Sequence, residues 1–353
     1  MQVITDWFRE HFSNPQVVFL ALFLVAVFAI VIVMGNMLAP VIAGVITAYV
    51  LEGVVKLLER AKLPRLFAVL IVFFAFFLFV ILILFGLMPL LSQQVTQLFQ
   101  QIPAMISKGQ TVLMQLPERY PDTISPAQVQ ELISEIRFEL TQMGQTVLSM
   151  SISSVVGVIT VLVYTILFPI LVFFFLKDKT KIIDWLSNYL PRDYHLAKQV
   201  WNDVDRQIGN YIRGKFWEIL AVGVASFATF TLFRLEYATL LGVLVGVSVL
   251  IPFVGAAVVT IPVVLIAWFQ WGWGADFAWV MVAYTVIQIL DGNLLVPLLF
   301  SEVVNLHPVA IIVAVLVFGG LWGIWGIFFA IPLATLVQAV LTAWPSGKPA
   351  EQA

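Results

Sequence analysis

"LFAVLIVFFAFFLFVILILFGLM", residues 66–88, contains no charged side chain. An apolar stretch of at least ~18 residues is long enough to cross a bilayer as one helix. Four further uncharged runs reach that length, and they cover residues 17–34, 152–176, 237–275 and 309–347. The sequence therefore predicts an all-α, polytopic integral membrane protein.

The composition supports this prediction and excludes several classes of protein. Of the 353 residues, 61% are hydrophobic and only 11% are charged, whereas an average soluble domain is about a quarter charged. Cysteine is absent, so disulfides and thiolate metal sites are excluded. The net charge of -2 and the lack of a dense basic run give no indication of nucleic-acid binding.

Lysine and arginine are unevenly distributed among the polar segments. Residues 52–65 carry four basic side chains and residues 177–215 carry eight, but the longer segment 89–151 carries only three. Positively charged loops stay in the cytoplasm. We therefore expect the first two segments and the N-terminus to be cytoplasmic and 89–151 to be extracytoplasmic. The first apolar run lacks an obvious cleavage site, so we interpret it as a retained helix.

Roughly seven to nine crossings account for these runs. A first helix covers 17–34, and a second ends near "YVLEG" at 49–53. The expected organisation is 1–88, N-terminal transmembrane helices; 89–151, an extracytoplasmic amphipathic segment; 152–176, a transmembrane helix; 177–215, a cytoplasmic amphipathic segment; 216–345, a C-terminal transmembrane transport region; and 346–353, a short tail.

The extracytoplasmic segment contains a predicted amphipathic helix. Ser125 is placed to cap it, with Pro126 at the first helical position and Gln128 completing a capping box. Its apolar face packs either on its own domain or the bilayer surface, or against another subunit. The apolar stripe consists of Val129, Leu132, Ile136, Leu140, Met143 and Val147.

The cytoplasmic segment has a comparable stripe among charged residues. Such a basic amphipathic helix lies either at the headgroup boundary or with a solvated charged face over an apolar contact. The stripe consists of Val200, Val204, Ile208, Tyr211 and Ile212.

Prolines and glycines interrupt the C-terminal apolar half. Prolines 252, 262 and 332 each remove a backbone donor, and the freed carbonyls cannot face lipid. A single proline of this kind is expected to kink a helix, whereas "IPFVG" with Gly255, and 291–308 with Gly292, are expected to form broken or re-entrant helices. Two stretches, 243–262 and 315–332, resemble each other loosely, as a pseudo-repeat of two broken hairpins would. Tryptophans 268, 271, 273 and 279 surround Asp276 and indicate a membrane interface.

Motifs for common enzyme chemistry are absent from the sequence. There is no G-x-x-x-x-G-K-[ST], H-E-x-x-H or G-x-S-x-G, and the three histidines, His11, His195 and His307, are scattered. We therefore expect no enzyme activity, no cofactor and no metal site.

"DGNLLVPLLFSEVVNLHP", residues 291–308, lies between two uncharged runs. Ionisable residues within a membrane usually face a cavity and a partner. Asp291 either binds a cation or polar solute, together with Gln288 and Asn293, or caps a helix end at the surface. Glu218 and Arg234 flank the fifth span and are expected at its interfaces. The candidate pathway residues are Asp291, Asn293, Gln288, Pro252, Gly255, Pro262, Pro297, Glu302 and His307.

A set of short motifs extends over almost the whole chain. They are "LKD" at 176–178, "LP" at 190–191, "YIRGK" at 211–215, "IPFVG" at 251–255, "QILDGNLLVPLLFSEVVNLHP" at 288–308, "GGLWGIWGIFFAIPLA" at 319–334 and "AWP" at 343–345. Together they resemble the autoinducer-2 exporter family of bacterial permeases. One departure is "YVLEG", where many relatives have a proline.

The resemblance implies an inner-membrane protein of about eight crossings whose best-known activity is export of autoinducer-2. It also implies a homo-oligomer, a pentamer in members like the exporter, and an elevator-like motion; some relatives resemble sodium or proton antiporters. Our leading hypothesis is a secondary transporter, an exporter of a small polar solute coupled to Na⁺ or H⁺. The alternatives are a passive channel and a membrane scaffold or regulator without transport.

Overall fold

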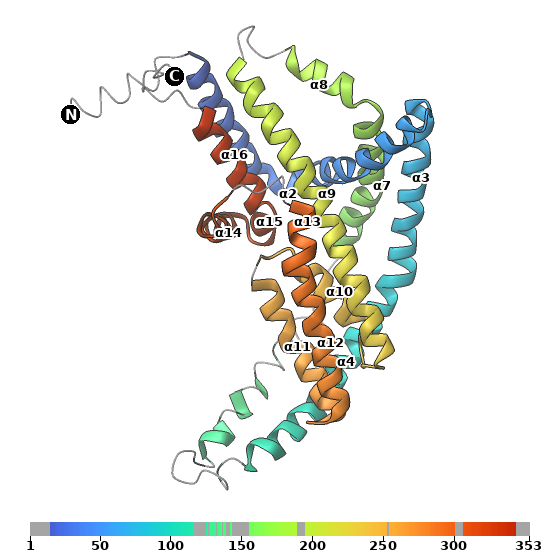
Figure 1. Ribbon diagram of the computed structural model, residues 1–353, viewed down its shortest axis with the longest axis vertical. Helices are drawn as coiled ribbons and strands as arrows, with labels where there is room; N and C mark the ends of the chain where they lie inside the picture. The colour runs from blue at the N-terminus through green and yellow to red at the C-terminus, as the bar shows by residue number, and fades with distance from the viewer. Residues whose placement is uncertain are drawn as a thin grey trace, which may run out of the picture.

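The fold is a bundle of long and short helices, described by a computed structural model (Figure 1). The described residues are 15–115, 155–188, 195–252, 254–300 and 306–343, with 117, 125, 127–131, 133–135, 137, 138 and 142. Within them there is no strand, and five helical segments are long and apolar enough to cross a bilayer, with four shorter apolar helices. The predicted all-α, polytopic membrane fold is confirmed.

The N-terminal group of helices differs from the prediction at its start. Helix α2 (Pro15–Arg60) is one continuous helix of 46 residues with Pro40 inside it. The prediction of two separate helices, one over 17–34 and a second ending near 49–53, is therefore wrong. "YVLEG" contains no proline, so the i→i−4 hydrogen bonds continue through it.

Helices α3 (Arg65–Leu82), α7 (Val155–Lys177) and α8 (Lys179–Ser187) complete this group. Val55 of α2, Val69 of α3 and Val172 of α7 form the centre of a fully buried apolar cluster. The opposite face of α3 is exposed, with Phe74 63% and Leu82 62% accessible. Because lipid is as apolar as these side chains, such a face fits the bilayer.

The helical backbone continues past residue 88. A π-helical turn, η1 (Ile83–Leu87), joins it directly to α4 (Met88–Leu113). The predicted boundary between span and extracytoplasmic segment at 88 is therefore not a helix end. The Gln94 side chain of α4 accepts a hydrogen bond from the backbone N–H of Leu240 at 2.8 Å, so α4 contacts the C-terminal helices.

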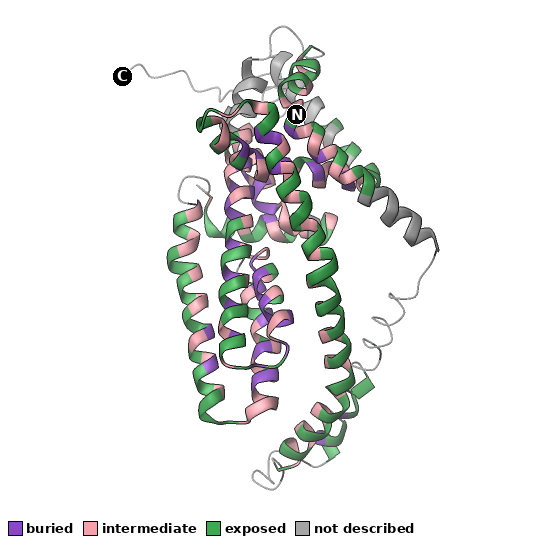
Figure 2. Ribbon diagram, turned by 90° about the vertical axis from the view of Figure 1, so that its right-hand side faces the viewer, coloured by how far each residue is buried: buried purple, intermediate pink, exposed green. Residues whose placement is uncertain are grey.

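The C-terminal group surrounds the second apolar core. It contains α9 (His195–Leu232), α10 (Ala238–Ser248), α11 (Val254–Trp271) and α12 (Ala275–Leu290). Figure 2 shows that buried residues gather on the central helices. Gly242 and Gly246 of α10 form a G-x-x-x-G pattern and lie directly against Phe227 and Gly223 of α9. Small residues at this spacing let two helix backbones approach closely.

Broken helices in the C-terminal half are confirmed at two places. Residues 249–252 turn between α10 and α11, as predicted from "IPFVG". Helices α14 (Pro308–Trp322), α15 (Ile324–Phe328) and α16 (Ala330–Ala343) are separated at Gly323 and Phe329. Gly323 has a φ of 60°, which a side chain rarely adopts.

Residues 291–300 are less interrupted than the sequence indicates, and residues 301–305 lie outside the described residues. Helix α12 continues through a π-helical turn, η2 (Asp291–Leu295), into α13 (Val296–Phe300). Pro297 therefore does not break the helix. It lies at the start of α13, directly after the π-helical turn, where the regular hydrogen-bond pattern is already interrupted.

Both amphipathic predictions agree with the described residues. The Ser125 N–H donates to Gln128 Oε1 at 3.0 Å and the Gln128 N–H donates to Ser125 Oγ at 3.3 Å, which is the predicted capping box. In the second stripe, Tyr211 and Ile212 are buried against Phe300. This part of the stripe packs on other helices, as in the second of the two interpretations, whereas the side chains of Val200 and Val204 are not described. Residues 132, 136, 140, 143 and 147 lie outside the described side chains.

Candidate functional site

A buried ion pair lies on the face of α9 that packs on α13. Lys215 Nζ donates a hydrogen bond to Glu218 Oε2 at 2.8 Å, and the two side chains are only 7% and 3% exposed. They are three residues apart, so both project from one side of the helix. Charges this deeply buried are expensive unless they are paired.

Asp291 is a third charged residue, further along the same interface, and among the described residues it forms no ion pair with Lys215. It interacts electrostatically with both Lys215 and Glu218. Asp291 is the first residue of η2, the π-helical turn that also contacts α9. Its Oδ1 atom is buried and has no hydrogen-bond partner among the described residues. Short π-helical turns inside α-helices are frequently found at functional sites.

Polar groups continue along the interface of α9 and α12. The two helices are antiparallel: Phe230 packs on Tyr284 at a ring distance of 6.0 Å, and Gly214 lies against Phe300. This register places Ser226 at the level of Gln288. Ser226 Oγ and Gln288 Nε2 are also buried without a partner among the described residues.

A hydroxyl pair extends this row to α11. Tyr284 and Thr260 lie 3.0 Å apart, oxygen to oxygen. We refer to the complete set as the α9–α12 polar interface; its members are Lys215, Glu218, Ser226, Thr260, Tyr284, Gln288 and Asp291. All belong to helical segments that are long and apolar enough to span a bilayer. It can therefore offer hydrogen bonds and charge to a polar solute inside the membrane.

Asp291 does not cap a helix end with its side chain, since the helix continues to Phe300. The surface-cap alternative is therefore wrong, whereas Asp291 and Gln288 lie together as expected. Asn293 is exposed, and its Nδ2 donates to the Ile289 carbonyl of its own helix at 2.9 Å. The structure thus places Asn293 away from the polar interface.

The other predicted pathway residues that the structure describes lie in a helix cap, a turn or a helix interior. His307 is exposed and caps α14, with Nδ1 accepting from the Val309 N–H at 3.2 Å. Pro252 lies in the turn after α10, while Gly255 and Pro262 lie in α11. Glu302 lies outside the described residues. The structure does not bring His307, Pro252, Gly255 or Pro262 into contact with Asp291.

Two of the central charges were missed by the sequence analysis. Glu218 was expected at an interface, but it is 2% exposed and lies in the middle of the 205–232 segment. Lys215 was counted among the cytoplasmic basic residues, but α9 continues across residue 215 without a break. A Lys–Glu pair at i,i+3 within the buried stripe of Tyr211, Val222 and Ser226 was the signal that could have located both.

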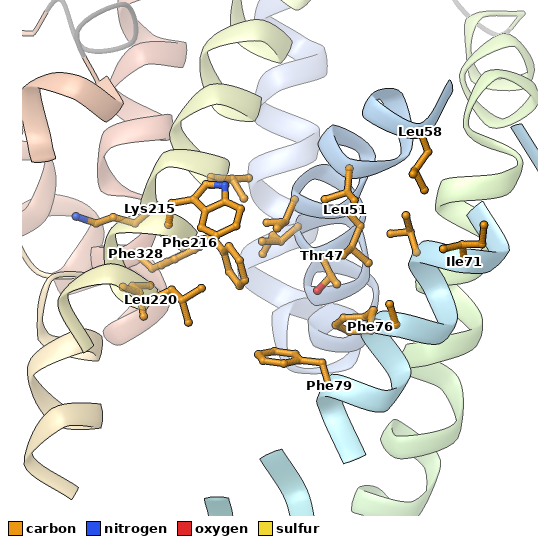
Figure 3. A pocket seen from close by; sticks show the side chains of 18 residues that line it. Thr47, Leu51, Leu58, Ile71, Phe76, Phe79, Lys215, Phe216, Leu220 and Phe328 are labelled. Carbon is orange, nitrogen blue, oxygen red and sulfur yellow. The ribbon is translucent and has the colours of Figure 1, made fainter. Parts of the chain in front are cut away.

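A large apolar cavity lies on the other side of α9. Its volume is about 710 Å³, and it separates α2 and α3 from α9 and α15. Lys215 is the one charged residue that lines it, and Figure 3 shows its side chain extending away from the other lining residues. The cavity therefore leaves space beside α9 that is lined almost entirely by apolar side chains, with Thr47 and Lys215 as the exceptions.

A further charged network connects α2 with α3, α7 and α8. Arg65 Nη2 donates to the Leu176 carbonyl at 2.8 Å and lies 3.3 Å from Glu52 Oε2, while Nη1 lies 3.2 Å from Glu59. Lys179 also approaches Glu52, at 3.8 Å. Because these residues tie helix ends to one another, we assign them a structural role.

Comparisons with known proteins cover almost the whole chain. The family "AI-2E family transporter" matches residues 18–346. The chain is 44% identical to "Putative permease PerM" of Escherichia coli K12 over 352 residues, which is 100% of both chains. It is 28% identical to "Putative transport protein YueF" of Bacillus subtilis, covering 94% and 92% of the two chains. A "Putative transport protein" of Thermotoga maritima is 23% identical, with 93% and 94% covered.

Proposed function

This chain belongs to the AI-2E family of transporters, and from that membership together with the α9–α12 polar interface we propose that it is a secondary transporter exporting a small polar solute. It is a multi-pass membrane protein. We place it in the bacterial inner membrane with its N-terminus in the cytoplasm, in accordance with the distribution of lysine and arginine.

The observation that carries the proposal is the buried pair of Lys215 and Glu218 together with Asp291, whose Oδ1 atom is buried. A charged side chain at the centre of a membrane helix costs roughly 2.5–3.5 kcal/mol on insertion scales, so such residues usually line a solute or ion pathway. The unpaired polar atoms of Asp291, Gln288 and Ser226 can hydrogen-bond a solute. We propose that the solute passes along this interface.

Coupling to Na⁺ or H⁺ belongs to the same proposal. The three charged side chains leave one carboxylate without a counter-charge, and a coupling cation would supply it. Movement of the helices in this region is favoured by the breaks between α10 and α11 and around α15, where the backbone is not held by continuous helical hydrogen bonds.

Transport is tested with the purified full chain in liposomes, with autoinducer-2 and a panel of small sugars and polyols as probes. We expect flux that responds to an imposed proton, sodium or potential gradient and that Asp291→Asn reduces at least tenfold. His307→Ala, at an exposed helix cap, should retain flux. Asp276→Asn is a matched control, because Asp276 lies in α12 and is exposed.

The same experiment separates the alternatives. Flux that no gradient changes, with large conductance in a planar bilayer, would indicate a passive channel. Normal flux in Asp291→Asn would remove this residue from the pathway. If no probe is transported and deletion of 123–148 abolishes a membrane complex, the scaffold alternative is favoured.

We also propose a homo-oligomer, a pentamer by family resemblance. Native mass spectrometry of the protein in detergent would give the number of chains per particle. A monomer at all protein concentrations would contradict the proposal.

The orientation of the chain in the membrane has its own test. Because the chain has no cysteine, the single substitution Lys181→Cys, at a side chain that is 83% exposed on α8, would report that orientation. The introduced thiol should react with a membrane-impermeant maleimide only from the cytoplasmic side.

A further inference from the structure

The charges in the α9–α12 polar interface do not balance. Glu218 and Asp291 each bring a carboxylate, and Lys215 brings one ammonium group. In this structure the ammonium is bonded to Glu218, and Asp291 Oδ1 is buried without a partner among the described residues. An isolated carboxylate in a poorly hydrated interior is far less stable than the neutral carboxylic acid. One positive charge is therefore missing.

No other described group supplies that charge. The elements packed against η2 are α9, α12 and α13. α9 presents Lys215, Glu218 and the buried Tyr211; α12 presents Tyr284 and carries Asp276, which is exposed in its first turn; and α13 has no titratable side chain. Neither tyrosine is a cation. Within the described part of the chain the charge therefore has no source, and we infer that it comes from solution.

We propose that Lys215 is an internal counter-ion that alternates between Glu218 and Asp291, and that one proton neutralises whichever carboxylate the ammonium group leaves. This rests on the proposed function for its role in coupling transport. The proton comes from water on one side of the membrane and forms one O–H bond with a carboxylate oxygen. It returns to water on the other side when Lys215 moves back. Lys215 keeps its own proton throughout.

The geometry around Lys215 suits such an exchange. The lysine side chain has a flexible stem and carries a compact charge, whereas the guanidinium group of arginine would be held in one planar geometry. The ammonium group also lies 5.5 Å from the centre of the Phe300 ring, an aromatic face that attracts cations without a formal charge. Phe300 is held in place because Gly214 packs directly against it.

A proton fits this position better than a metal ion does. No group of three or more His, Cys, Asp or Glu side chains in the described part of the chain could hold a metal ion. Sodium would need several oxygen ligands around Asp291, whereas a proton needs only one carboxylate oxygen.

The inference is tested by counting protonated buried carboxyl groups in the purified full chain. Infrared spectroscopy at neutral pH detects them, because exposed carboxylates are ionised there and give no carboxylic-acid band. We expect a band equivalent to one group in the wild type and in the Asp276→Asn control. Asp291→Asn and Glu218→Gln should each abolish the band, because one carboxylate then remains for Lys215. Lys215→Met should double it.

If Lys215→Met fails to fold, the double variant Lys215→Met/Glu218→Gln replaces it in the infrared measurement. It lacks the ion pair, keeps Asp291, and should retain a band equivalent to one group. An unchanged band in Asp291→Asn and Glu218→Gln, or saturable binding of ²²Na⁺ that Asp291→Asn abolishes, would overturn the inference. The readout needs no transported solute. Failure of flux in liposomes with the expected infrared pattern would reject the proposed function and leave the shared proton intact.

Discussion

Gly246 of α10 lies against Gly223 of α9 so closely that a Cβ atom on Gly246 would stand 2.8 Å from the Gly223 Cα. This contact presses α10 onto α9, the helix that carries Lys215 and Glu218. The close approach depends on the absence of side chains at both positions, since backbone atoms on either side cannot move aside as a flexible side chain does.

We therefore expect Gly246→Ala to destabilise the protein by about 1–3 kcal/mol, the usual cost of overpacking. Thermal unfolding in detergent would measure it. Gly109→Ala in α4 is the control, because a Cβ there meets nothing within 4 Å. That control should be neutral or slightly stabilising, since alanine is the better helix former. Equal unfolding temperatures for both variants would contradict the packing argument.

The two members of the buried ion pair should differ in their effect on stability. Lys215→Met leaves Glu218 and Asp291 without a cation, and breaking a buried pair in this way typically costs about 3–5 kcal/mol. Glu218→Gln should cost less, because Asp291 is within electrostatic reach of Lys215 and can replace the lost partner. Thermal unfolding of both variants at neutral pH compares them. A larger loss in Glu218→Gln would argue against re-pairing.

The membrane fold was predictable from the sequence because an uncharged run of spanning length is typical of a helix that crosses a bilayer. The capping box of Ser125 and Gln128 and the break at "IPFVG" were also predictable, because both depend on local backbone chemistry. The continuity of the helices was harder to predict from the sequence. Nothing local distinguishes two helices from one at 15–60 when the apolar composition continues throughout, and π-helical turns leave no clear sequence signal.

The candidate site was predicted only in part. Asp291 and Gln288 were found because a polar residue inside an apolar run is conspicuous. Lys215 was missed because the positive-inside rule assigned the end of a basic segment to the cytoplasm, and Glu218 because it stands at the start of the fifth apolar run and was expected at its interface. Only the packing of α9 on α12 and η2 shows that these charges are buried together.

Arg65 should be irreplaceable by lysine. Its guanidinium group contacts the Leu176 carbonyl, Glu52 and Glu59 at once, and one ammonium group cannot match that planar arrangement. We expect Arg65→Lys to lower the free energy of unfolding by about 1–3 kcal/mol, since a polar group near buried Glu52 is left unsatisfied. Lys181→Ala is the control, because its pair with Asp178 is exposed and such pairs contribute about 0–1 kcal/mol. Similar losses in the two variants would refute a special role for Arg65.

The two broken hairpins should respond alike to substitution of one glycine each. A Cβ on Gly255 would collide with the carbonyl oxygen of Ser248, and a Cβ on Gly326 would collide with that of Phe318. Each glycine thus allows the chain to fold back tightly on the preceding helix, at corresponding places in the similar stretches 243–262 and 315–332. We expect Gly255→Ala and Gly326→Ala each to open the turn and to reduce the yield of folded protein severalfold in size-exclusion chromatography. Gly292→Ala should leave the yield unchanged, because a Cβ there meets nothing within 4 Å. If only one of the two hairpin variants is impaired, the hairpins are not equivalent and the pseudo-repeat is a chance similarity of apolar sequence.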